Sequence, residues 1–250
     1  MFSVTNPTAA SPRSMLYCIL RSPNQPLALP PGIRQVQVEG IAAVVSDADP
    51  ERVRTADRSM LQGYADLIAD LHRVANLIPM RYGCIAESDD SVLRLLQLRR
   101  SRLGTLLDKL EGCAELGVRL LLPGFDANDA VSGDEPGDVR PGHAHLAVIR
   151  QRFQGEVRVA EQAKVVRAAI ERATVGLFRD TRVEQGQVDG RHLLSLYYLV
   201  PRPACHDFVE AVRLAPDPFP DSMMNHCLVS GPWPPYNFVG AIDDDLRCLT

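Results

Sequence analysis

The stretch Ser88–Leu122 reads SDDSVLRLLQLRRSRLGTLLDKLEGCAELGVRLLL, and it combines a helix and a strand. Ser88 is a favourable N-cap residue, and the two aspartates after it lie in the first turn, where the helix dipole favours anions. Leucines then recur at three- and four-residue steps, which is typical of an amphipathic helix, until Gly112 provides a stop. Cys113–Leu122 follows as an apolar run of strand type. The stretch therefore predicts a helix leading directly into a strand.

Before this stretch, strand-like runs outnumber helices. The expected strands and the one expected helix are, in order, strand Met15–Leu20, strand Val36–Val38, strand Ile41–Val45, helix Pro50–Val74 and strand Leu77–Ala86. The full order β, β, β, α, β, α, β predicts an antiparallel or mixed sheet with helices on one side, close to the ferredoxin-like topology.

After this stretch, the composition changes and a second domain is expected. Residues 123–142 are rich in Gly, Pro and acidic residues, which is typical of a linker or long loop. The elements expected beyond it are a long helix His145–Phe178, a polar loop Arg182–Gly190, a strand His192–Val200, a helix Cys205–Leu214 and a strand Asn225–Ser230. The prediction is an α+β chain with an N-terminal ferredoxin-like domain at 14–122 and a C-terminal α+β domain at 143–240. The latter ends in a Pro-Trp-Pro-Pro arm, and an acidic tail follows at 241–250.

Composition excludes several classes of protein. With 250 residues, 46% apolar and 23% charged, the chain has ordinary globular values, which exclude wholesale disorder. A net charge of -4 without a basic run gives no reason to expect a nucleic-acid partner. No apolar run approaches the length of a membrane span, and no signal peptide is visible, so a cytoplasmic protein is expected. The six cysteines contain no C-x-x-C pair, so reduced thiols are expected.

The search for catalytic motifs yields little. There is no G-x-S-x-G, Walker A, H-E-x-x-H or G-x-G-x-x-G pattern, and no cofactor is predicted. His143 and His145 form an H-x-H pair that would share a metal ion on an extended segment. On a helix the two side chains would lie about 200° apart and could not do so. Since the pair lies at the start of the expected long helix, a solvated helix start is the favoured interpretation.

The most unusual segment is Ser230–Val239, SGPWPPYNFV, which contains the only tryptophan. Its prolines fix φ and remove backbone donors, which predicts that the segment leaves the sheet as a stiff arm. The tryptophan either anchors the arm on its own domain or is displayed to a partner. The internal anchor is favoured, because a sole tryptophan is more often packed than displayed. The candidate residues for a protein interface or structural anchor are Trp233, Pro234, Pro235, Tyr236 and Phe238.

This ten-residue segment resembles the closing signature of the gas vesicle protein L/F family (GvpL/GvpF). Further stretches agree with that family in order along the chain: Leu16–Ile19, Gly40–Ser46, Ile78–Cys84, Glu115–Arg119, Leu196–Val200 and Phe208. The resemblance covers nearly the whole chain from Met15 to Val239. The L-type and F-type members are not separable from these motifs.

The resemblance implies a non-enzymatic protein with two α+β domains and no catalytic residues. It implies a minor structural or accessory role in gas vesicles, with the hydrophobic shell protein and other accessory proteins as partners. It also implies a place on the gas vesicle within the cytoplasm, for some members on the gas-facing side. We hypothesise that the edge near Ile78–Ile85 or the arm at Trp233–Phe238 makes the contact. Two alternatives remain open: a ligand-binding regulatory module, and a metal-dependent enzyme using His143 and His145.

Overall fold

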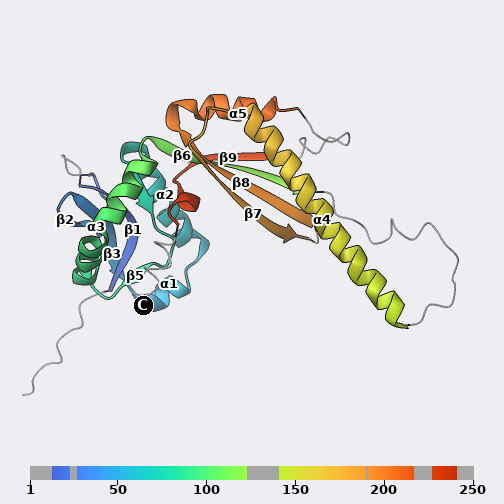
Figure 1. Cartoon of the computed structure of the whole chain (residues 1–250). Helices are drawn as coiled ribbons and strands as arrows, with labels where there is room; N and C mark the ends of the chain where they lie inside the picture. The colour runs from blue at the N-terminus through green and yellow to red at the C-terminus, as the bar shows by residue number, and fades with distance from the viewer. Residues whose placement is uncertain (1–12, 23–26, 123–140, 190, 217–226, 241–250) are drawn as a thin grey trace, which may run out of the picture. The chain divides into compact units, whose positions relative to one another are not determined.

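The computed structural model describes residues 13–22, 27–122, 141–189, 191–216 and 227–240, with backbone only for 141–156 (Figure 1). The predicted α+β class is confirmed: the chain forms two sheets with accompanying helices. Contacts divide the chain after Glu115 and after Pro232 into two compact units. The first unit contains the described residues 13–115 and 233–240, and the second lies between the two breaks. This division differs from the expected domains, since the chain from Trp233 onward belongs to the first unit.

The first unit holds five strands and three helices among its described residues. They are β1 (Arg13–Arg21), β2 (Ile33–Val38), β3 (Ile41–Ala48), α1 (Pro50–Arg54), α2 (Arg58–Val74), β4 (Leu77–Pro79), β5 (Ile85–Ala86) and α3 (Asp89–Leu110). The sheet has the order β2-β3-β1-β4, and β5 also pairs with β1. All of its described pairs are antiparallel. The described residues between β1 and β2 contain no helix, which is a difference from the β-α-β-β-α-β order of a ferredoxin-like fold.

The second sheet takes strands from both sides of the long helix. Its elements are β6 (Cys113–Leu122), α4 (Pro141–Ala173), β7 (Asp180–Val188), β8 (Arg191–Pro201), the 3-10 turn η1 (Arg202–Ala204), α5 (Cys205–Arg213) and β9 (Leu228–Trp233). The strand order is β7-β8-β6-β9, so β7 and β9 form the two edges. None of the described helices combines the length and the apolar character needed to cross a membrane. The predicted tail and residues 123–140 of the predicted linker lie outside the described residues.

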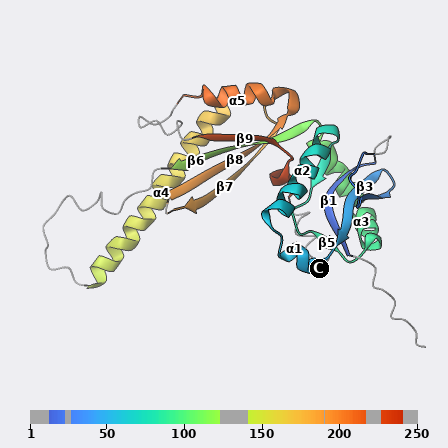
Figure 2. The same ribbon diagram turned by 180° about the vertical axis from the view of Figure 1, so that it is seen from behind.

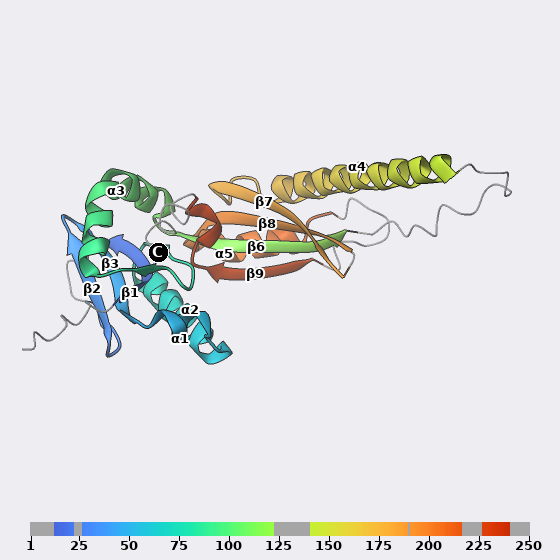
Figure 3. The ribbon, with the colours of Figure 1, turned by 90° about the horizontal axis from the view of Figure 1, so that it is seen from below.

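Helices cover both faces of the first sheet, so the predicted placement on one side is wrong. Every residue of β1 between its two ends is buried, which requires cover on both faces, because successive side chains point to opposite faces. Tyr64, Ile68 and Leu71 of α2 share one core cluster with strand residues, and no residue of α3 belongs to it. Helix α3 nevertheless contacts β1, β2 and β3, and Figure 3 shows α2 and α3 on opposite sides of the strands.

Two expected elements of the first unit are interrupted. The helix expected over Pro50–Val74 is two helices, because the Asp57 carboxylate accepts a hydrogen bond from the Met60 amide at 2.9 Å and caps a new start. The strand expected over Leu77–Ala86 is reduced to β4 and β5. Pro79 has no amide hydrogen for a ladder, and the chain turns between them at Gly83, whose φ is +88°.

The prediction of a polar loop over Arg182–Gly190 is wrong, because most of this segment belongs to strand β7. Its residues pair with β8 without interruption from Asp180, opposite Leu199, to Val188, opposite Arg191. Most of β7 is exposed, and its sequence DTRVEQGQV is polar. An edge strand needs no alternating apolar pattern when it faces solvent, so the sequence pattern misses it.

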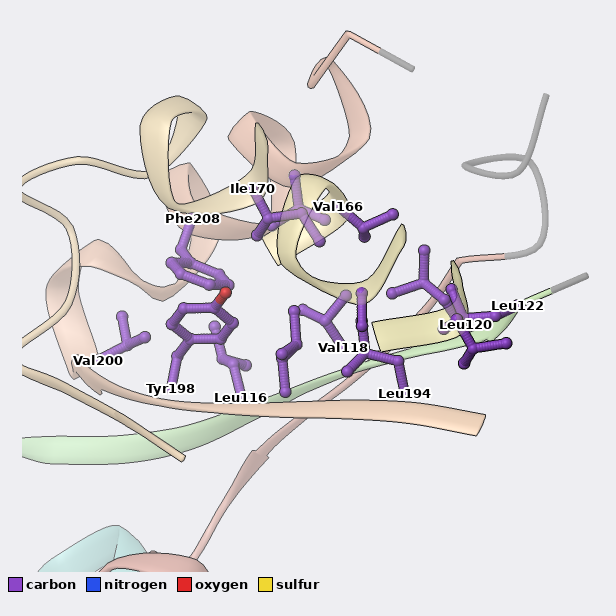
Figure 4. Close-up of a cluster of buried hydrophobic side chains, with 14 residues drawn as sticks. Leu116, Val118, Leu120, Leu122, Val166, Ile170, Leu194, Tyr198, Val200 and Phe208 are labelled. Atoms are coloured by element: carbon purple, nitrogen blue, oxygen red, sulfur yellow. The ribbon is translucent and has the colours of Figure 1, made fainter. Parts of the chain in front are cut away.

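The core of the second unit lies between its sheet and helices α4 and α5, which cover one sheet face (Figures 1 and 2). Figure 4 shows the cluster, whose buried members are Leu116, Val118, Leu120, Leu122, Val159, Ala163, Val166, Ile170, Leu194, Leu196, Tyr198, Val200, Phe208 and Val212. Tyr198 lies at its centre, with ring centroids 5.0 Å from Phe178 and from Phe208. Burial raises the pKa of the Tyr198 hydroxyl.

Replacing Tyr198 by phenylalanine is expected to stabilise the protein. The Tyr198 hydroxyl is buried and has no hydrogen-bond partner among the described residues. An unsatisfied buried polar group costs about 1–3 kcal/mol, so Tyr198→Phe is expected to raise the free energy of unfolding by about 1 kcal/mol. Denaturant titration measures this. Tyr197→Phe is the matched control, because the Tyr197 hydroxyl donates to Glu184 at 3.2 Å. A clear loss of stability in Tyr198→Phe would contradict the expectation.

Candidate functional site

The proline-rich segment leaves the second sheet later than predicted. Pro232 and Trp233 still belong to β9, where an edge strand tolerates a proline that has no amide hydrogen to donate. Pro234 and Pro235 follow as two consecutive residues without a donor, so the ladder cannot continue. The chain therefore leaves the sheet after Trp233 and not at Pro232. We call residues 234–239 the arm.

The arm is a fixed turn. The Tyr236 amide donates to the Pro234 carbonyl at 2.8 Å, and the Phe238 amide donates to the Pro235 carbonyl at 3.2 Å. A 3-10 turn, η3 (Tyr236–Phe238), results. Pro234, Pro235, Phe238 and Val239 are buried, with Phe238 only 2% exposed. The arm is thus held on the first unit by apolar burial.

Trp233 is half-exposed and not fully buried. Its side chain is 51% exposed, although sequence reasoning favours it as the internal anchor. Phe238, five residues later, is the buried aromatic ring. Leu228 at the other end of β9 is 60% exposed. The edge strand β9 therefore presents two large apolar side chains to solvent.

Tyr236 connects the arm to the core of the first unit. It packs against the cluster that contains Cys18 and Tyr64. Burial, followed by the nearby Cys18 thiol and the Glu115 carboxylate, raises the pKa of Tyr236 to about 12. Each cause disfavours the phenolate, so the site holds Tyr236 in its neutral form.

This raised pKa predicts an alkaline loss of stability. A tyrosine in the unfolded chain has a pKa near 10, so the contribution of Tyr236 to the free energy of unfolding is fully present below about pH 10. Its contribution is then lost as the pH rises through the folded pKa of about 12. Between pH 10 and 12, the free energy of unfolding of the Tyr236→Phe variant is expected to fall by roughly 1–2 kcal/mol less than that of the wild type. This range already allows for the partial exposure of the ring, which weakens the effect. Urea titrations at a series of pH values measure this, and equal losses would contradict it.

The buried carboxylate of Glu115 accepts two hydrogen bonds from the arm, and we call this pair of hydrogen bonds the Glu115 clasp. Glu115 of β6 is 4% exposed; its Oε2 accepts a hydrogen bond from the Asn237 amide at 2.8 Å, and its Oε1 accepts one from Asn237 Nδ2 at 2.7 Å. Hydrogen bonds to a charged acceptor are about twice as strong as neutral ones. Sequence reasoning misses this pair, because the partners are 122 positions apart. A glutamate inside the apolar run of β6 is the signal that could have indicated it.

The histidine pair of the sequence lies in α4. His143 and His145 are helical, and their side chains are outside the described residues. Within the ranges that the structure describes, no group of three or more His, Cys, Asp or Glu side chains could hold a metal ion.

Two hollows of the first unit are lined by residues that the structure describes. The smaller, about 310 Å³, is mostly apolar and is lined by Met15, Tyr17, Pro30, Pro31, Ile33, Met60, Gly63, Tyr64, Leu67 and Tyr82. The Tyr64 hydroxyl is used within the protein, because it donates to the backbone carbonyls of Leu16 at 2.8 Å and Met80 at 3.0 Å. The larger, about 790 Å³, lies beside α1. Three charged residues line it, Arg13, Glu51 and Arg54, and the last two pair with each other.

Comparison with known proteins indicates what the chain is related to. The family model "Gas vesicle synthesis protein GvpL/GvpF" matches residues 14–240. Gas vesicle protein F of Streptomyces sp. (strain CB03234) is 28% identical over 220 residues, covering 84% of this chain and 89% of the relative. Gas vesicle protein L of the same strain is also 28% identical, covering 80% of this chain and 78% of the relative.

The fold has a solved counterpart. The crystal structure of gas vesicle protein GvpF from Microcystis aeruginosa superposes with a TM-score of 0.69 at 16% identity, covering 92% of this chain and 99% of that one. This similarity supports the two-sheet α+β fold, and the family match spans both units and the arm. The chain therefore belongs to the gas vesicle synthesis protein GvpL/GvpF family and has an accessory role in gas vesicles.

Proposed function

We propose that this protein assists gas vesicle assembly by binding the hydrophobic shell protein and other accessory proteins, and that it catalyses no reaction. The observation that carries this proposal is Trp233, half-exposed on strand β9 and followed by an arm that burial and the Glu115 clasp hold in place. Exposed tryptophans are frequent hot spots of protein interfaces. A rigid support reduces the entropy lost on binding.

The partner follows from the physics of a gas-filled shell. A wall that excludes water needs subunits with apolar faces and open strand edges, and such subunits aggregate when they are free. A soluble protein that offers its own strand edge and an apolar side chain can cover these surfaces until the subunit joins the wall. Strand β9 offers both features, with Leu228 and Trp233 exposed at its ends.

The alternative contact near Ile78–Ile85 is less suitable. Leu77, Ile78, Met80 and Ile85 are all buried, and both β4 and β5 pair with β1. Little apolar surface remains there for a partner. We therefore assign the contact with the shell protein to β9 and Trp233. We further propose that the protein lies on the vesicle, at the gas-facing side, where the shell is apolar.

Coexpression tests this proposal. The tagged full-length chain is produced together with the shell protein, and the bound fraction is recovered on the tag. We expect the shell protein to be captured by the wild type and by Leu98→Ala, an exposed apolar control on α3 that is 83% exposed. Absence of shell protein from the captured fraction would contradict the proposal. Mass spectrometry of washed vesicles then measures whether the protein stays in the finished wall, as a gas-facing position requires.

A further inference from the structure

Strand β7 leaves a long sheet edge open. It is nine residues long and lies at the end of the order β7-β8-β6-β9, so no described strand pairs with its outer side. It contains no proline, and its pairing with β8 has no bulge. Seven of its residues, from Arg182 onward, are exposed. Open edges of this length usually carry a device that blocks pairing with another chain.

The outward backbone groups can be identified from Thr181. Its amide donates to Asp180 Oδ1 at 2.8 Å, and its carbonyl accepts from Arg182 Nη1 at 3.0 Å, so both groups point away from β8. In an antiparallel pair, only every second residue exchanges hydrogen bonds with the neighbouring strand. Val183, Gln185 and Gln187 therefore direct their amide and carbonyl groups outward as well.

The charges on β7 are complementary to a second copy of the same strand. In a symmetric antiparallel pair, residue i of one copy faces residue j of the other, and the reverse contact repeats it. When Val183 faces Val183 of the second copy, Arg182 faces Glu184 of the second copy, and this attraction occurs twice. Side chains directly opposite each other in a sheet interact in this way.

Neighbouring registers are penalised. A register centred on Glu184 would place the two Glu184 carboxylates opposite each other, and one centred on Arg182 would oppose the two guanidinium groups. Like charges directly opposite are destabilising. The register centred on Val183 also joins outward-pointing residues, Val183 with Val183 and Thr181 with Gln185. When Thr181 pairs with Gln185 of the second copy, its amide and carbonyl give up their hydrogen bonds to the Asp180 and Arg182 side chains and form backbone hydrogen bonds instead.

We propose that β7 is a homodimerisation edge, at which two copies of this chain pair antiparallel with Val183 on the twofold axis. The pattern Arg182-Val183-Glu184 carries both signs of charge, so it matches a second copy and opposes the two registers centred on Arg182 and on Glu184. This contact lies on the edge opposite β9 and does not depend on the proposed function.

Charge exchange tests the dimer. Sedimentation velocity of the full-length chain over a concentration series measures the dissociation constant for the wild type, Arg182→Glu, Glu184→Arg and the double variant. Each single variant turns two attractions into two repulsions, so we expect association to weaken roughly 10- to 100-fold. The double variant restores the wild-type constant. Arg213→Glu, on α5, is the matched control and leaves it unchanged. Circular dichroism verifies that each variant folds.

Cross-linking tests the register. Val183→Cys faces its own counterpart at a Cα separation of about 5.5 Å, which allows a disulfide, and is expected to form a covalent dimer on oxidation. Gln185→Cys faces Thr181 and is expected to stay monomeric, like the oxidised wild type. A monomeric wild type at every accessible concentration, a double variant that stays weak, or cross-linking through Gln185→Cys would overturn the proposal.

Discussion

Replacing Phe238 by alanine is expected to lower the free energy of unfolding of the first unit by about 3–5 kcal/mol. Phe238 is 2% exposed and closes the arm, so truncation leaves a cavity and removes the buried aromatic ring of the arm. The neighbouring clasp depends on the same turn, because Asn237 precedes Phe238 and donates twice to Glu115. Chemical denaturation of the full chain, followed by circular dichroism, measures the loss.

Trp233→Ala is the matched comparison for stability. Trp233 is the larger ring, but half of it is exposed, so its truncation is expected to lower the free energy of unfolding by less than that of Phe238. An equal or larger loss in Trp233→Ala than in Phe238→Ala would contradict the assignment of Phe238 as the anchor.

Trp233→Ala is expected to weaken capture of the shell protein by roughly 30-fold or more. A tryptophan at the centre of an interface typically costs 2 kcal/mol or more on truncation, which corresponds to that factor. The arm itself keeps its structure in this variant, because Pro234, Pro235 and Phe238 remain buried. A titration of shell protein against immobilised full-length chain measures the change in affinity.

Two variants make this result specific. Leu98→Ala removes another exposed apolar side chain from the first unit and is expected to bind as the wild type does. Trp233→Phe keeps an aromatic ring and is expected to recover part of the affinity. Unchanged binding by folded Trp233→Ala would show that the contact lies elsewhere on the protein.

Elements with strong local signals were predictable from the sequence. Helix α3 begins after Ser88, whose hydroxyl accepts from the Ser91 amide at 3.3 Å, and the chain turns at Gly112, whose φ is +66°. Strand β6 then occupies Cys113–Leu122, as expected. In each case the capping residue lies next to the segment that it delimits, or the apolar run lies inside it, so neighbouring residues were enough.

Features that depend on distant partners were not predictable. The polar strand β7 is defined by its pairing with β8 and carries no apolar pattern of its own. The cover on both faces of β1 depends on two helices that follow it by tens of residues. The candidate site needed the structure as well: the arm could be located from its prolines, but which aromatic ring is buried depends on the fold of the first unit. A hydrogen bond between Glu115 and Asn237 has no spacing signature at all.

Deletion of the gene in gas-vesicle-forming cells that carry it tests the central claim most directly, with flotation as the measurement. We expect cells without the protein to lose buoyancy, the wild-type gene to restore it, and a Trp233→Ala gene expressed at the same level to restore it poorly. Normal flotation of cells that lack the protein would contradict the account.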